Sequence, residues 1–246
     1  MSHATMKKIT TFSFKKGDII ARKYSIVERI GKGYEGEVYL VKEKNTGVKR
    51  AMKIYFPHRN KGNKALTFSA RTLDRLKHCQ IVTQYHTEDS FEYNERKVHF
   101  SVSEFVDGEM LSTYIKYQTG KRLPMYQALH LLYALVKGLE DIHEKKRYHG
   151  DIHVDNIMIE TFGITCKMKL IDVFNWDNQS TRSQNIQEDI VQAIQLFYDV
   201  IGGSTWFKKL PDDVREMCCG MKRTKILKKF RSMRALRNYI EKIEIW

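Results

Sequence analysis

One short segment of the chain, YHGDIHVDNIMI (residues 148–159), combines several side chains that can donate, accept or carry a proton. These are His149, Asp151, His153, Asp155 and Asn156, and they alternate with apolar residues of strand character. A buried polar group without a partner is costly, so such a cluster either satisfies itself internally or faces a ligand.

A glycine-rich segment, IGKGYEGEV, fits the pattern G-x-G-x-x-G-x-V through Gly31, Gly33, Gly36 and Val38. The runs on either side have strand character, so the glycines join two strands and do not open a helix. This position disfavours a Rossmann dinucleotide site and favours a flap whose backbone N–H groups cover phosphates. An ordinary glycine-rich hairpin is the alternative.

The strand that follows contains Ala51-Met52-Lys53, in which the lysine has apolar neighbours and is expected to point inward. Lysines are seldom buried without an anionic partner. Further along, KLIDVF ends in Asp172, a carboxylate at the end of another strand-like run.

The flap, Lys53, the H-x-D-x-x-x-x-N of the first segment and Asp172 occur in the order and spacing of the protein-kinase signature set. The chain therefore resembles the protein-kinase-like superfamily from about Tyr24 to Ile243, and within it the compact atypical Ser/Thr kinase-like proteins. The resemblance implies an ATP-dependent phosphotransferase with Mg²⁺, or Mn²⁺ in its place, as cofactor.

The resemblance also assigns roles. It implies that Lys53 holds the α- and β-phosphates and that Asp151 orients the attacking hydroxyl and accepts its proton. It makes Asn156 and Asp172 the metal ligands, whose oxygens suit Mg²⁺. The residues expected around the nucleotide are Gly31, Gly33, Gly36, Val38, Ala51, Lys53, Glu104, Val106 and Met158.

The two histidines differ in what they imply. His149 resembles a structural histidine that braces the loop. His153 stands where protein-directed members of the family usually carry lysine, and H-G-D-x-H is similar to choline and aminoglycoside phosphotransferases. His153, assigned here to the catalytic set, either touches the transferred phosphate or hydrogen-bonds within the loop.

The surrounding pattern predicts an α+β, two-lobed protein-kinase-like fold. Residues 1–16 read as a loosely held leader, and residues 17–106 as an N-lobe with a five-stranded antiparallel sheet and one helix at 65–77. Residues 107–246 read as a mostly helical C-lobe, with helices near 124–145, 186–201 and 212–221 and a last one at 226–243. Between them, two short strand-like pieces are joined by a turn at Gly163.

Three departures from the family pattern qualify this expectation. Ser69 falls where the glutamate partner of Lys53 is expected, so Lys53 must be held by phosphate, held by Asp172, or held poorly. The Asp-Phe-Gly triplet is replaced by Asp172-Val173-Phe174. Only residues 173–188 separate Asp172 from Asp189, the expected structural aspartate, so the usual activation segment is missing.

Composition sets the remaining limits. Hydrophobic residues make up 42% of the 246 residues, enough for a sizeable core, and the net charge of +14 favours an anionic partner. The four cysteines show no disulfide framework, and no apolar run is long enough for a signal peptide or membrane span, which predicts a cytoplasmic protein. The segment MKRTKILKKFRSMRALRNY is basic throughout, indicating a solvated face or, as the alternative, a surface for an acidic protein or RNA.

Three functions remain open at this point. The first is a minimal Ser/Thr protein kinase without activation-loop control, acting on a protein substrate. The second is a small-molecule kinase, which H-G-D-x-H favours. The third is a pseudokinase that binds nucleotide or a partner without turnover.

Overall fold

The computed structural model describes residues 8–162, 166–172 and 181–244. It divides the chain into two compact units, Met1–Asp74 with Thr83–Val106, and Arg75–Val82 with Asp107–Trp246. The expected boundary after residue 106 is also the boundary between these units, except that residues 75–82 group with the second one. Each unit is described by itself.

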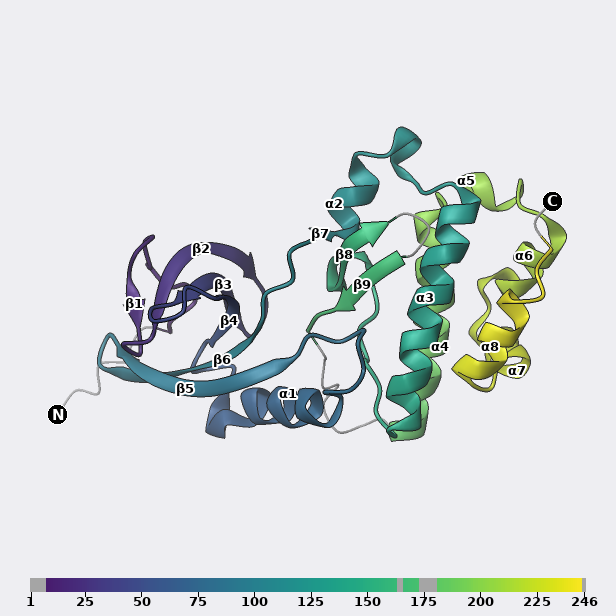
Figure 1. Cartoon of the computed structure of the whole chain (residues 1–246). Coiled ribbons are helices and arrows are strands. Elements are labelled where there is room, and N and C mark those ends of the chain that lie inside the picture. The colour runs from purple at the N-terminus through teal and green to yellow at the C-terminus, as the bar shows by residue number, and fades with distance from the viewer. Residues whose placement is uncertain (1–7, 163–165, 173–180, 245–246) are drawn as a thin grey trace. The chain divides into compact units, whose positions relative to one another are not determined.

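The first unit is built on one antiparallel sheet, which curls on itself (Figure 1), with the strand order β1-β2-β3-β4-β6-β5. A single longer helix, α1 (Lys64–Arg75), follows the first four strands. The strands are β1 (Ile19–Ile20), β2 (Tyr24–Lys32), β3 (Gly36–Glu43), β4 (Lys49–Tyr55), β5 (Tyr85–Tyr93) and β6 (Arg96–Glu104).

The sheet has six strands where the sequence predicts five. The additional strand, β1, is only two residues long, and it pairs with the start of β2 across a turn at Ala21 and Arg22, both of positive φ. Two residues are too few for an alternating hydrophobic pattern, which explains why the sequence did not indicate this strand.

The N-terminal segment differs from the loosely held leader that the sequence predicts. Ile9 and Phe12 are buried in the same core cluster as Tyr39, Met52 and Phe100. Phe12 stacks on Phe56 at 5.6 Å between ring centroids. The segment is therefore packed on the sheet from residue 9 onward.

The register of the sheet sorts its side chains onto two faces. Met52 and Ile54 of β4 are buried in the core cluster, as is Tyr39 of β3. Val38 lies directly opposite Lys53, and both point to the other face because side chains alternate along a strand. Strand register thus brings Val38 and Lys53 together.

The second unit contains two long helices side by side, with a small three-stranded sheet beside them (Figure 1). The helices are α2 (Leu111–Lys116), α3 (Met125–Glu144), α4 (Arg182–Val200), α5 (Ser204–Phe207), α6 (Asp212–Met217), α7 (Arg223–Lys229) and α8 (Met233–Ile240). The strands are β7 (Glu109–Met110), β8 (Ile157–Phe162) and β9 (Cys166–Leu170).

Residues 75–82 belong to the second unit because they pack against α3 and β9. Gly138 of α3 lies so close to Ile81 that a Cβ at this position would come within 2.3 Å of the isoleucine Cδ1. The Leu170 N–H also donates to the Ile81 carbonyl at 2.6 Å. A side chain at position 138 would push this segment off the helix.

The last predicted helix, 226–243, is in fact two helices. Phe230 has an extended backbone and ends α7, and the Ser232 hydroxyl accepts a hydrogen bond from the Ala235 N–H at the start of α8. Serine is a preferred N-cap residue because it satisfies a backbone donor of the first turn. Basic residues continue through this break, so the composition of the segment did not indicate where α7 ends and α8 begins.

Other expected boundaries move by a few residues. Pro124 lies just before α3, as its N-cap, and α4 begins at Arg182 because Thr181 and Gln184 form a capping box. The turn expected at Gly163 lies outside the described residues. Among those described, no helix is both long and apolar enough to cross a bilayer.

Candidate active site

The flap half of the predicted site lies on the first unit. Gly31 is paired with Val38 across β2 and β3, and Val38 is paired with Lys53 across β3 and β4. Ala51 lies two residues before Lys53 on the same face of β4. The sheet therefore brings together the glycine, valine, alanine and lysine that the sequence predicts around a nucleotide.

Gly36 is required by sterics. A Cβ at this position would lie 2.1 Å from the Ile54 carbonyl oxygen, so only glycine lets the flap approach β4 this closely. The Gly33 N–H donates to the Gly36 carbonyl at 2.9 Å and closes the turn at the tip. The tip is thus a tight strand-to-strand connection, as expected from its glycine spacing.

Lys53 has a carboxylate partner that the sequence did not predict. Its Nζ lies 2.9 Å from Glu35 Oε2 in the flap, and the two side chains are only 20% and 27% exposed. Helix α1 contains Asp74 as its only acidic residue and has Ser69 at the position of the missing glutamate. Glu35 is therefore a partner of Lys53 in addition to the phosphate and Asp172 that the sequence named.

The segment expected to meet the adenine lies at the end of β6. The Glu104 N–H donates to the Gln84 carbonyl at 2.9 Å, and its carboxylate accepts from the Gln84 N–H at 3.1 Å. Val106 is buried. Ser103 is paired with Ala51 of β4, so its small side chain lies next to the predicted nucleotide face.

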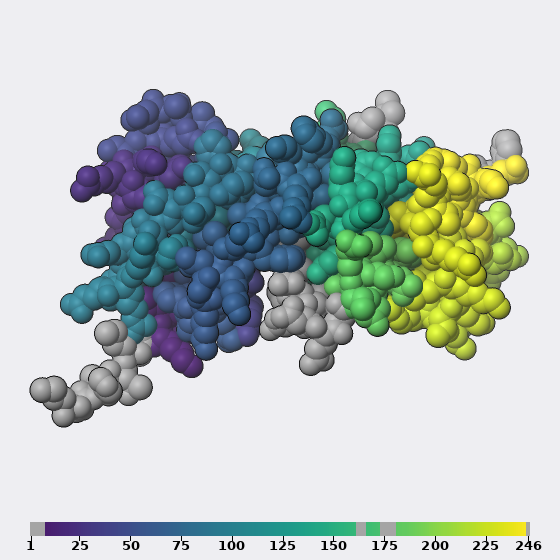
Figure 2. Space-filling model, turned by 90° about the horizontal axis from the view of Figure 1, so that it is seen from below, coloured from purple at the N-terminus to yellow at the C-terminus, as the bar shows by residue number. Residues whose placement is uncertain are grey.

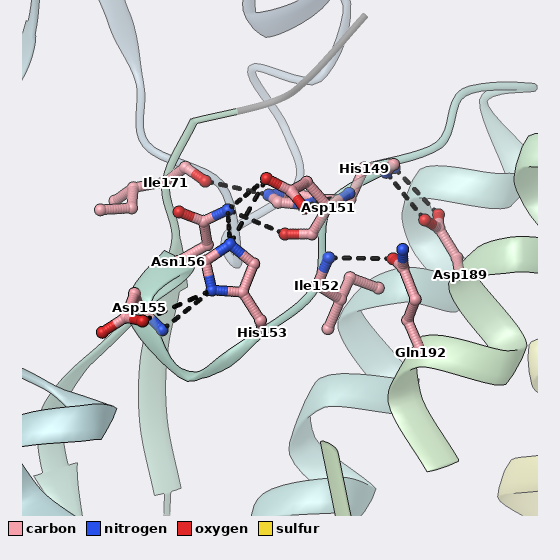
Figure 3. Close-up of polar contacts among 10 residues, drawn as sticks. His149, Asp151, Ile152, His153, Asp155, Asn156, Ile171, Asp189 and Gln192 are labelled. Carbon is pink, nitrogen blue, oxygen red and sulfur yellow. Dashed lines mark hydrogen bonds and ion pairs between the residues drawn. The ribbon is translucent and has the colours of Figure 1, made fainter. Parts of the chain in front are cut away.

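The catalytic-loop half of the site lies on the second unit (Figure 3). Asp189 of α4 is fully buried and accepts hydrogen bonds from the backbone N–H groups of His149 and Gly150, at 2.9 and 2.8 Å. His143 Nε2 lies 2.9 Å from the same carboxylate. One buried carboxylate therefore holds the start of the loop.

His149 has the structural position that the sequence predicts. It is fully buried, and its Nε2 hydrogen-bonds the Ile171 carbonyl at 3.0 Å. Burial lowers the pKa of His149 below its ordinary value, despite the nearby Asp189 and the bond to Ile171. The ring is thus neutral and joins the loop to the end of β9.

Asp151 and Asn156 lie within hydrogen-bonding distance across the loop (Figure 3). Asn156 Nδ2 donates to the Asp151 backbone carbonyl at 2.9 Å and to its Oδ2 at 3.1 Å. Asn156 is buried, whereas the Asp151 side chain is 34% exposed. The amide therefore fixes a carboxylate that a substrate hydroxyl can reach.

His153 makes hydrogen bonds within the loop, one of its two predicted roles. Its Nδ1 accepts the Asp155 N–H at 3.2 Å, and its Nε2 lies 2.9 Å from Asn156 Nδ2 and 3.4 Å from Asp151 Oδ2. The side chain is 44% exposed, so contact with a substrate phosphate stays a prediction.

The two predicted metal ligands come from adjacent backbone segments. The Ile171 N–H donates to the Asn156 carbonyl at 3.0 Å, and Asp172 follows with a positive φ of 54°. Because Asn156 Nδ2 is used by Asp151, its Oδ1 is the atom that suits a cation. Two hard oxygen donors fit Mg²⁺ chemically.

Few of the described side chains at this place could bind a metal ion. Within the described ranges, no group of three or more His, Cys, Asp or Glu side chains is arranged to hold a metal. Mg²⁺ in nucleotide sites usually keeps water and phosphate oxygens as most of its ligands. Val173 and Phe174 lie outside the described residues.

Two features of the site were missed by sequence reasoning. Glu35 gave no signal, because a flap glutamate reaches Lys53 only through the curvature of the tip. Gln192 of α4 accepts the Ile152 N–H at 2.9 Å and adds a second support from α4 to the loop. Its place one turn after Asp189 is the signal that could have found it.

Comparison with known proteins agrees with this geometry. The family model described as "Protein kinase domain" matches residues 24–207. The human serine/threonine-protein kinase Nek5 is 32% identical over 150 residues, which are 59% of this chain and 20% of Nek5. Calcium-dependent protein kinase 4 of Plasmodium falciparum is 26% identical over 191 residues, 76% of this chain and 34% of that protein.

Among solved structures, the crystal structure of a kinase domain aligns with a TM-score of 0.61 at 18% identity, covering 80% of this chain and 69% of that one. It supports the fold alone. The chain spans about a fifth of the length of Nek5. The family match extends over about three quarters of the chain, from β2 to α5, and includes both halves of the candidate site: the chain belongs to the protein kinase domain family.

Proposed function

We propose that this chain is an ATP- and Mg²⁺-dependent phosphotransferase that acts on Ser or Thr hydroxyls of proteins, without control by an activation loop. The observation that carries the proposal is the Asp151–Asn156 pair, a partly exposed carboxylate held by a buried amide on a braced loop. Several of the matched relatives are named serine/threonine-protein kinases.

The proposed reaction follows from the positions of these groups. A substrate hydroxyl attacks the γ-phosphorus of ATP, the new O–P bond forms as the bond to the bridging oxygen of ADP breaks, and the proton passes to Asp151. His153 and Asn156 keep the Asp151 carboxylate oriented. Lys53 binds the α- and β-phosphates, with Gly31, Gly33, Gly36, Val38 and Ala51 around the nucleotide.

The metal completes this arrangement. Asn156 and Asp172 would hold Mg²⁺, which when bound neutralises charge on the phosphates. The adenine would lie against Met158 of β8 and meet the backbone of Glu104 and Val106. Only residues 173–180 lie between Asp172 and the Thr181 cap of α4, which supports a kinase without loop-phosphorylation control.

Labelled ATP distinguishes the candidate reactions. The wild-type chain with Mg²⁺ and a dephosphorylated cell lysate is expected to label proteins on Ser or Thr, and Asp151→Ala and Asp172→Ala are expected to abolish this label. Labelling of choline or an aminoglycoside instead would favour the small-molecule kinase. Equal signals in all three samples would remove both enzyme functions and leave the pseudokinase.

The second unit also carries a basic surface that suits an anionic partner. Arg215, Lys222, Lys225, Lys228 and Lys229 line an open groove of about 810 Å³ beside α6 and α7. In Figure 2 the C-terminal part of the second unit is coloured yellow-green and yellow. An acidic protein segment fits better than RNA, because Phe207 is the single aromatic ring lining the groove and RNA readout relies on several stacking rings.

Only part of the basic segment is available for this role. Arg234 and Arg237 of α8 bind Glu140 of α3, both at 2.7 Å. These two arginines attach α8 to α3. Changing Lys222 and Lys225 to Glu should abolish retention on an acidic peptide, while the same change at exposed Lys15 and Lys16 should not; retention on RNA alone would favour the other partner.

A further inference from the structure

The flap tip is fixed independently of the Glu35 carboxylate. The Phe56 N–H donates to the Glu35 backbone carbonyl at 2.8 Å. The neighbouring Tyr34 ring lies 3.7 Å from the Arg59 guanidinium carbon and also hydrogen-bonds this arginine. Together with the close approach at Gly36, these contacts hold the backbone of residue 35 over the end of β4.

This fixed backbone aims one carboxylate at one ammonium group. Glu35 Oε2 lies 2.9 Å from Lys53 Nζ, which also lies 5.5 Å from the Tyr55 ring centroid. The two charged side chains are partly exposed, at 20% and 27%, and neutralising either one removes this contact from the other. The pair therefore restricts where Nζ can lie.

An ammonium group has three N–H donors, so a bond to one carboxylate is compatible with bonds to phosphate oxygens. Ordering a free lysine side chain costs up to about thirtyfold in affinity. The Lys53 ammonium lies between the carboxylate and the phosphate, so its attraction to each of them offsets the repulsion between the two. Pre-ordering of Lys53 should outweigh the repulsion.

We propose that Glu35 is a positioning residue that holds Lys53 Nζ in the place where it meets the phosphates of ATP, and that it keeps this contact when nucleotide is bound. The inference rests on the proposed function, because it needs Lys53 to bind phosphate. It assigns to the flap a task beyond covering the nucleotide, namely placing the cation on the neighbouring strand.

Binding titrations with ATP–Mg²⁺ and with adenosine test this directly, because adenosine has no phosphates. Glu35→Gln should weaken ATP binding about tenfold, the size of one charge-assisted hydrogen bond, and leave adenosine binding unchanged. Glu35→Asp keeps the charge on a shorter side chain, so its affinity for ATP should lie between those of the wild type and Glu35→Gln. Glu28→Gln is the matched control, since Glu28 is an exposed carboxylate on β2 of the same sheet.

A double-mutant cycle shows whether the effect acts through Lys53. In a Lys53→Met background, Glu35→Gln should not weaken ATP binding further. Unchanged or tighter ATP binding by Glu35→Gln alone would overturn the inference and leave the proposed function intact. Equal weakening of ATP and adenosine would show a structural role instead, and a wild-type chain that binds neither ligand would remove the proposed function and the inference with it.

Discussion

The flap and the catalytic loop are supported in different ways. The catalytic loop depends on Asp189, a fully buried carboxylate that accepts from two backbone N–H groups and contacts His143. On the flap side, Lys53 forms a partly exposed ion pair with Glu35. Because several buried donors share Asp189 as their acceptor, no other residue can easily replace it. The carboxylate that pairs with a lysine can instead come from another segment of the chain. This difference explains why the chain departs from the family pattern at the partner of Lys53 but has the expected aspartate at position 189.

The largest effect is expected from Asp189→Ala. Three donors would lose their acceptor inside the protein, which should lower the free energy of unfolding by about 3–5 kcal/mol. Asp189→Asn keeps one acceptor oxygen and should cost less. Glu35→Ala should cost less than about 1 kcal/mol, since its ion pair is partly exposed. Urea unfolding measures all three, and a Glu35→Ala cost as large as that of Asp189→Ala would contradict the comparison.

The next effect concerns turnover. Asn156→Asp retains an oxygen ligand but replaces the donor to Asp151 with a second carboxylate, which repels the first. Phosphate transfer under single-turnover conditions should fall at least about 100-fold, the usual contribution of a positioned acid or base. If Asn156→Asp transferred phosphate at the wild-type rate, the amide would not be what fixes Asp151.

Acid should weaken the two units in separate pH ranges. Burial lowers the pKa of His149 below its ordinary value of 6.5. As the pH falls, His149 therefore binds a proton in the unfolded chain before it does so in the folded chain. The stabilisation that comes from the neutral buried ring is complete above pH 6.5 and decreases below it. Burial raises the pKa of Glu37, but hydrogen bonds from Tyr39, Thr11 and the Phe12 N–H outweigh it and lower the net value. Its contribution is complete above pH 4.5 and is lost below.

Urea unfolding at a series of pH values measures both contributions. His149→Asn should flatten the pH dependence just below 6.5, and Glu37→Gln should flatten it only below about 4.5. A His149→Asn protein with the wild-type slope near pH 6 would show that the buried ring does not set the acid sensitivity of the second unit.

The smallest effects are expected on α8. Arg237 is 25% exposed and Arg234 is 63% exposed, and both bind Glu140 of α3. Arg237→Ala should therefore lower the thermal unfolding midpoint more than Arg234→Ala, since exposed ion pairs contribute little. Raising the salt concentration should weaken the contribution of the exposed Arg234 more than that of Arg237. A larger loss at Arg234 would place the main contact elsewhere.

Much of the fold was predictable because its signals are local and repeated. The glycines of the flap, the alternating residues of β3 and β4 and the apolar face of α3 each follow from strand or helix periodicity. The short strands β1 and β7 were not predictable, because two residues are too few to show a periodic pattern. The break between α7 and α8 was not predictable either, because it depends on one hydrogen bond to the Ser232 hydroxyl.

The site divides in the same way. Asp151, Asn156 and Lys53 were predicted as site residues from their spacing, because the chemistry of phosphoryl transfer requires these residue types in this order. The Glu35–Lys53 pair could not be predicted, since it depends on how the flap tip bends back over β4. The loop contacts of His153 depend on its orientation, which sequence spacing leaves open.

The most direct test of the account is a crystal structure with a non-hydrolysable ATP analogue and Mn²⁺, whose anomalous signal locates the ion. The account predicts manganese bound by Asn156 Oδ1 and Asp172, with Lys53 Nζ contacting both a phosphate oxygen and Glu35. Manganese bound elsewhere, or Lys53 away from the phosphates, would contradict it.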